Sequence, residues 1–252
     1  MTVEEIIKAV RFCYDEEELN DASFTPASAQ DNTYMNNIIK SKIGDAVRWI
    51  CLYSPAELLG GSDVKKTSGG VTVDVPTGIL VDAEVKTQSP TDNGVTLQPA
   101  EDPVDCRRLI MPSDFIKLAR VRVLGWHRAI KTPIAEDSDE YLQLYDTNGA
   151  TATDDRPIAA IIDKSQTEIE LWPSLEENIE VHVTYVSSVS PVGLDANGDP
   201  VAPGTDPVQY ALPPRVKTAF IYYLAFLVLS AYEDSRAARM LDIAKMNIGK
   251  NG

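Results

Sequence analysis

Leu212-Pro213-Pro214-Arg215 opens the most informative stretch of this chain, and the apolar block AFIYYLAFLVLSAY follows it at residues 219–232. A second helical pattern comes next, with a stripe made of Ala237, Leu241, Ala244 and Ile248. An ordinary surface helix keeps one polar face, whereas the 219–232 block is apolar on every face. Lipid, a thick protein core or neighbouring subunits must therefore cover it.

Length and flanking charge argue against lipid. A helix needs about 20 apolar residues to span a bilayer, and this block has 14, bracketed by Arg215 and Lys217 on one side and Glu233 and Asp234 on the other. The N-terminal sequence MTVEEIIKAV carries acids where a signal peptide needs bases, so no export is expected. The sequence predicts a buried helix and no membrane partner.

Length, net charge and cysteine content limit the classes of protein to which this chain can belong. The chain has 252 residues, 44% of them hydrophobic, which suits one elaborated domain or two small ones. Its net charge of −15 argues against a protein that coats DNA, which needs cations facing the phosphates. Three widely spaced cysteines without a Cys-x-x-Cys pair are expected to be reduced thiols in the core.

Two helices are predicted at the N-terminal end, within residues 1–58. Thr2 followed by Glu5 is a capping-box pattern, which marks a helix start. A longer helix is expected to begin near Asp31 or Asn32 and to end before Pro55. The apolar stripe of this second helix includes Ile39, Ile43 and Val47.

The amino-acid composition and the spacing of apolar residues change in the middle of the chain. Residues 59–108 are rich in Gly, Ser, Thr and Asp with short β-like runs, which indicates an inserted loop or hairpin segment. Residues 109–190 alternate apolar and polar side chains, which predicts an antiparallel β-module, either a small sheet or a sandwich. Residues 191–211 form a turn-rich loop, and residues 212–252 complete the fold with a helical hairpin and tail.

Motifs for catalysis, cofactors and metals are missing. His182 lies mid-strand and His127 at a strand end, neither with zinc-ligand spacing. Residues 60–67 lack the second glycine of a phosphate-binding loop. Residues 195–199 begin like a calcium loop, but an Asn197-Gly198 turn explains them better. We therefore expect no enzyme, no cofactor and no metal site.

The order of elements resembles the head-to-tail adaptor proteins of short-tailed bacteriophages, which form rings below the portal. The residues that carry the resemblance are Arg48-Trp49, Leu109–Phe115, Leu171-Trp172-Pro173 followed by Val181–Tyr185, Leu212–Arg215 and Glu233-Asp234. They cover about two thirds of the chain. The long additions at 60–103 and 191–207 are similar to ring proteins of crAss-like phages.

The resemblance implies an α+β fold, namely a helical bundle with an inserted antiparallel β-module. It also implies a dodecameric ring that docks on the portal and extends the DNA channel to the tail, beside other tail or ring proteins. Genomic DNA would pass without sequence-specific binding, which an acidic lumen favours because it repels the phosphates. The expected location is the neck or tail of the virion, after assembly in the host cytoplasm.

Two groups of residues are expected to make the contacts. Portal or ring binding is assigned to the second C-terminal helix, through Met240, Ile243, Ala244, Met246 and Ile248. The alternative for that helix is packing on the first hairpin helix, and both can hold at once. Packing within the bundle or between subunits is assigned to Phe220, Tyr223, Leu224, Leu227, Ile39, Ile43 and Val47.

Two other functions stay open at this point. Charge alone would also suit an acidic monomeric binding module, such as a DNA mimic or an inhibitor of a host factor. Another structural protein of the neck or the tail tube would share the same composition. An adaptor differs from the first of these in forming large rings on the portal.

Overall fold

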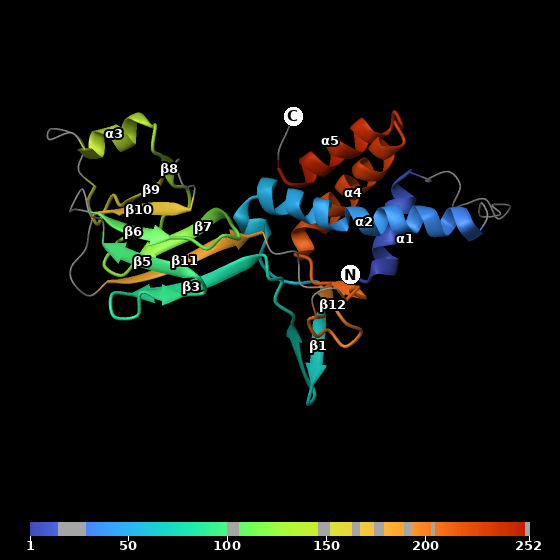
Figure 1. Ribbon diagram of the computed structural model, residues 1–252, viewed down its shortest axis with the longest axis horizontal. Helices are drawn as coiled ribbons and strands as arrows, with labels where there is room; N and C mark the ends of the chain where they lie inside the picture. Colours follow the sequence, from blue (N-terminus) through green and yellow to red (C-terminus); the bar gives the residue numbers. More distant parts are fainter. Residues whose placement is uncertain are drawn as a thin grey trace. The chain divides into compact units, whose positions relative to one another are not determined.

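The computed structural model describes residues 1–14, 29–99, 106–145, 152–162, 167–173, 179–188, 193–202 and 205–249 (Figure 1). The fold is α+β, as predicted. The chain divides into two compact units. Unit 1 contains both ends, Met1–Ile79 and Val189–Gly252, and unit 2 is the continuous segment Leu80–Ser188. The division between Ile79 and Leu80 falls inside the segment 59–108, which was predicted as one insertion.

Unit 1 contains four of the helices. They are α1 (Val3–Tyr14), α2 (Ala29–Tyr53), α4 (Lys217–Ala231) and α5 (Ala237–Asn247), with short 3-10 helices η1 (Ala56–Leu58) and η2 (Pro214–Val216). The predicted capping box is confirmed, because the Glu5 amide donates to Thr2 Oγ1 at 3.1 Å and the Thr2 amide donates to Glu5 Oε2 at 2.9 Å. Helix α2 begins at Ala29, slightly earlier than predicted, and ends before Pro55.

Helix α4 is the centre of unit 1 and contacts α5, α2 and α1. Its buried side chains are Ala219, Phe220, Ile221, Leu224, Ala225, Val228 and Leu229. The turn into α5 is stabilised by Asp234, whose carboxylate accepts from the amide and guanidinium of Arg236. These hydrogen bonds lower the pKa of Asp234 to about 2. At 15 residues α4 is too short to cross a membrane, and no other helix in the described ranges meets the length and hydropathy required.

Two small hairpins complete unit 1. Strands β1 (Lys65–Ser68) and β2 (Val71–Asp74) pair through a Gly69-Gly70 turn, where both glycines have positive φ. Strands β12 (Gly193–Leu194) and β13 (Gln209–Tyr210) pair beside the N-terminus. The Met1 ammonium lies 2.9 Å from Asp63 Oδ2. The two hairpins share a small core made of Val64, Val75, Leu194 and Ala211.

Unit 2 contains two sheets that share one apolar core. One sheet has the order β3-β11-β7, with β3 (Leu80–Lys86), β11 (Glu180–Ser187) and β7 (Phe115–Val123). The other has the order β4-β5-β6-β10-β9-β8, with β4 (Thr91–Asp92), β5 (Val95–Pro99), β6 (Arg107–Ile110), β10 (Glu168–Trp172), β9 (Ile158–Ile162) and β8 (Ile134–Ala135). The prediction of purely antiparallel pairing was wrong at one place, because β8 runs parallel to β9.

A buried carboxylate connects the larger sheet to helix α3 (Asp139–Tyr145), a helix that was not predicted from the sequence. Glu170 of β10 is fully buried, and its Oε1 accepts from Arg108 at 3.0 Å. Its Oε2 accepts from the hydroxyls of Tyr141 and Tyr145, each at 3.0 Å. Because a carboxylate without partners is costly inside a protein, these donors explain why α3 packs over β10.

The same contacts predict that Tyr141 and Tyr145 lose their protons late in an alkaline titration, because their pKa values are raised more than those of Tyr185, Tyr210, Tyr223 and Tyr232. Burial raises the pKa of Tyr145 to about 12, and burial also raises the pKa of Tyr141. An unfolded tyrosine loses its proton near pH ~10, so the folded state binds more protons above that pH and stability falls as the pH rises.

Phenolate absorbance should therefore show a late phase that coincides with unfolding of unit 2. The double variant Tyr141→Phe/Tyr145→Phe should lose this phase and keep the early one. A single phase for all the tyrosines of the wild-type protein would contradict the buried network.

Candidate functional site

The predicted portal-binding residues of α5 divide between core and surface. Met240, Ala244 and Ile248 are buried within this chain. Ile243 is half-buried and Met246 is 57% exposed. The packing of α5 on α4 accounts for the three buried residues, so only Ile243 and Met246 can reach another protein without local unfolding.

The predicted packing residues also fall into two groups. Phe220 and Leu224 of α4 are buried, and so are Ile39, Ile43 and Val47 of α2. Tyr223 and Leu227 are only half-buried. The contact between α2 and α4 thus covers one side of the apolar helix, as expected, and leaves another side partly exposed.

This partly exposed side of α4 continues onto the end of α2 as an aromatic stripe, defined here as Trp49, Tyr53, Tyr223, Phe226 and Leu227, in which Trp49 is itself buried. The rings of Trp49 and Tyr223 stack with centroids 4.1 Å apart, and Tyr223 lies 5.4 Å from Phe226. Tyr53 is 47% exposed at the end of α2. The sequence from 218 to 232 contains no charged residue, so the stripe lacks the charges that a solvent-facing helix usually carries.

The second candidate region is the polar sheet face of unit 2, defined as the outward side chains of β3, β11 and β7. Its members are Asp82, Glu84, Lys86, Arg120, Arg122, Glu180, His182 and Thr184. Alternation produces this face, because Ala83, Val85 and Val121 point into the core while their neighbours along each strand point outward.

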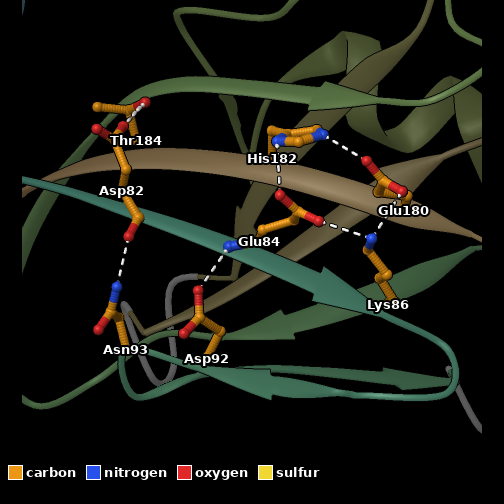
Figure 2. Close-up of polar contacts among 8 residues, drawn as sticks. All are labelled: Asp82, Glu84, Lys86, Asp92, Asn93, Glu180, His182 and Thr184. Carbon is orange, nitrogen blue, oxygen red and sulfur yellow. Dashed lines mark hydrogen bonds and ion pairs between the residues drawn. The ribbon is translucent and has the colours of Figure 1, made fainter.

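The β3 side of the polar sheet face is a charged network (Figure 2). Lys86 Nζ lies 2.7 Å from Glu84 and 3.1 Å from Glu180. His182 Nε2 lies 2.8 Å from Glu180 Oε1, and its Nδ1 lies 3.8 Å from Glu84 Oε2. Hydrogen bonding to Lys86 lowers the pKa of Glu180, and hydrogen bonding to Glu84 and Glu180 raises the pKa of Lys86.

Glu84, Glu180 and His182 are the residues in the described ranges that could hold a metal ion. Their ligand atoms all lie within 4.8 Å of one another. The ammonium of Lys86 already lies between the two carboxylates and supplies the positive charge there. A metal would have to displace it, so the network is explained by ion pairing alone. Sequence spacing could not reveal this cluster, because β3 and β11 are far apart in the chain.

The β7 side of the polar sheet face is hollow and basic. A hollow of about 420 Å³ is lined by Arg120, Arg122, Leu124, His182 and Thr184. Both arginines are exposed, and Leu124 is 64% exposed. Within the described part of the chain neither arginine takes part in an ion pair. The guanidinium groups of Arg120 and Arg122 at this hollow are therefore available to bind a group from another molecule.

Local structure explains two stretches that were considered as metal sites in the sequence, His127 and residues 195–199. His127 Nδ1 lies 2.5 Å from Asp155, an exposed pair whose hydrogen bond raises the pKa of His127. The Asn197-Gly198 turn is confirmed, because Asp195 Oδ1 accepts from the amides of Asn197 and Asp199, and Gly198 has a positive φ. In addition, Lys66 pairs with Asp199 across the hairpins of unit 1. Neither place gathers a catalytic set.

No protein-family model matches this sequence, and a search of curated proteins finds no match to it either.

Proposed function

We propose that this protein is a structural virion protein, a head-to-tail adaptor whose copies form a ring on the portal and extend the DNA channel to the tail. In this proposal unit 1 is the helical bundle of the adaptor, and unit 2 is the β-module inserted into it. The order of the helices, with both chain ends in unit 1, supports this assignment.

The observation that carries the proposal is the aromatic stripe. Helix α4 has contacts with three helices of its own chain and still leaves Tyr223, Phe226 and Leu227 partly exposed. Uncharged aromatic surface of this kind is typical of the buried centre of a protein interface. A neighbouring copy in a ring would cover it, while Ile243 and Met246 on α5 would remain for the portal.

The acidic character of the chain supports passage of DNA and fits a rival function equally well. A net charge of −15 per copy would repel phosphates if part of it faced a channel. A DNA mimic would carry the same charge. The two functions differ in assembly, because only the adaptor requires many copies on one portal.

The decisive experiment mixes this protein with its cognate portal and records negative-stain images. Added ring density below the portal is the expected result, and its absence would overturn the adaptor proposal. Leu227→Glu should reduce the occupancy of the ring at least about tenfold, because it places a charge in the contact between copies. Val71→Glu, at a position that is 64% exposed on the β1–β2 hairpin, is the matched control and should assemble normally.

A further inference from the structure

The polar sheet face carries opposite charge on its two sides. Thr184 of β11 lies opposite Asp82 of β3 and opposite Arg120 of β7. His182 likewise lies opposite Glu84 on one side and Arg122 on the other. Two rows therefore cross the sheet, each with an acid at one end, Thr184 or His182 in the middle and an arginine at the other end.

Within one copy the ends of each row lie apart. Neighbouring strands are about 4.8 Å apart, so β3 and β7 are separated by roughly 10 Å. Within one copy the two acids contact the middle residues of their rows and not the arginines. Thr184 donates to Asp82 at 2.6 Å, and His182 lies beside Glu84, as Figure 2 shows. Arg120 and Arg122 are therefore left available for a group from another molecule.

The acids and the arginines share one spacing. Asp82 and Glu84 are two residues apart on β3, and Arg120 and Arg122 are two residues apart on β7, which gives about 6.5 Å in each pair. Both strands run antiparallel to β11, so they run in the same direction. A second copy that brings its β3 to β7 can thus align Asp82 with Arg120 and Glu84 with Arg122 at the same time.

We propose that Arg120 and Arg122 of one copy bind the carboxylates of Asp82 and Glu84 of a second copy. Guanidinium groups match carboxylates in shape, and an ionised carboxylate can accept further hydrogen bonds beyond those that Thr184, Lys86 and His182 make. The hollow beside Leu124 has room for the incoming side chains. This inference rests on the proposed ring in taking the partner to be a copy of the same chain.

Such a contact suits a ring. It joins one side of a face to the opposite side of the same face in the next copy, so it is heterologous, the kind of contact from which a ring is built when the rotation between copies closes. It also works against the overall repulsion between copies that each carry −15. The contact should therefore set the register between copies, while the aromatic stripe supplies apolar burial.

A cross-linking experiment tests the pairing directly. The variant Arg122→Lys places an amine at the hollow, and a carbodiimide then couples it to any carboxylate in contact. Equal amounts of ¹⁵N-labelled and unlabelled chains are mixed, with and without portal. The expected product joins position 122 to Asp82 or Glu84 with one labelled and one unlabelled peptide. Arg128→Lys, at another exposed arginine of unit 2, is the control and should give no such product.

A charge exchange gives an independent readout. Arg120→Glu/Arg122→Glu alone should raise the concentration needed for half-assembly at least about tenfold, and Asp82→Lys/Glu84→Lys alone should do the same. An equal mixture of the two variants should assemble like the wild type, because each β7 side then meets an opposite β3 side. Rescue by mixing also shows that both variants are folded.

The outcomes separate this inference from the adaptor proposal. A wild-type ring on the portal, together with normal assembly of both variants and no mixed-label product, overturns the paired contact and keeps the adaptor. A mixed-label product without any ring on the portal keeps the contact between copies and overturns the adaptor.

Discussion

Leu224→Ala is expected to lower the free energy of unfolding of unit 1 by about 2–5 kcal/mol. Leu224 is fully buried in α4, the helix that contacts α1, α2 and α5. Removing its side chain leaves a cavity that these helices can fill only in part, so the cost includes lost burial and lost packing.

The measurement must report on unit 1 alone, because a chain with two units need not unfold in one step. Trp49 lies in unit 1, whereas Trp126 and Trp172 lie in unit 2, so Trp49 fluorescence in a background with the other two changed to Phe follows unit 1. Urea unfolding of Leu224→Ala in that background should shift to lower urea.

Leu227→Ala is the matched control, since it makes the same change one turn later on the same helix. Leu227 is half-buried, so we expect a loss of no more than about 1 kcal/mol. Equal losses for the two variants would contradict the assignment of Leu224 to the core and Leu227 to the exposed stripe.

Glu170→Ala is expected to lower the free energy of unfolding of unit 2 by about 2–4 kcal/mol. The substitution removes the shared acceptor of Arg108, Tyr141 and Tyr145. The two tyrosine hydroxyls then keep only their contact with each other, at 2.9 Å. This expected loss of free energy is smaller than the loss from breaking a fully buried ion pair, because the Arg108 side chain is 32% exposed. Helix α3 should lose its hydrogen bonds to β10.

Trp172 reports on this region, because its ring lies 5.5 Å from Tyr145 in an edge-on arrangement. Urea unfolding followed by Trp172 fluorescence should show the loss, and Glu170→Gln should lie between Glu170→Ala and the wild type, since the amide can still accept from one tyrosine. Glu140→Ala, an exposed position on α3, should cost less than about 1 kcal/mol. A cost for Glu170→Ala as small as that for Glu140→Ala would mean that the buried network does not hold α3.

Local patterns in the sequence were sufficient for the helices of unit 1. The capping box at Thr2 and Glu5, the stripe of Ile39, Ile43 and Val47, and the uncharged block after Arg215 each depend on neighbours within a few turns of helix. Such patterns are visible without knowing the fold, because helical periodicity is a local property. The same holds for the Asn197-Gly198 turn.

The candidate contact surfaces depended more on the fold. The division of α5 into a buried Met240 and an exposed Met246 required knowledge of where α4 lies. The run at 136–140 is acidic, and Asp137, Asp139 and Glu140 are exposed, but its local pattern does not show that α3 begins at Asp139 and buries Tyr141. Glu170 follows the alternation of an outward strand residue, but β10 has α3 over its outer face, so the carboxylate is buried.

The amino-acid sequence is sufficient to identify residues 219–232 as an apolar helix in need of cover, because every face of that block is apolar whatever surrounds it. How much of that cover the chain supplies depends on the tertiary fold: α4 packs against α1, α2 and α5, and in this arrangement Phe220 and Leu224 are buried while Tyr223 and Leu227 stay partly exposed. The tertiary fold also decides that Asp82 and Arg120, on strands without sequence proximity, become the two ends of one row. Strand pairing is a long-range choice, made by burial of the shared core and not by any local pattern.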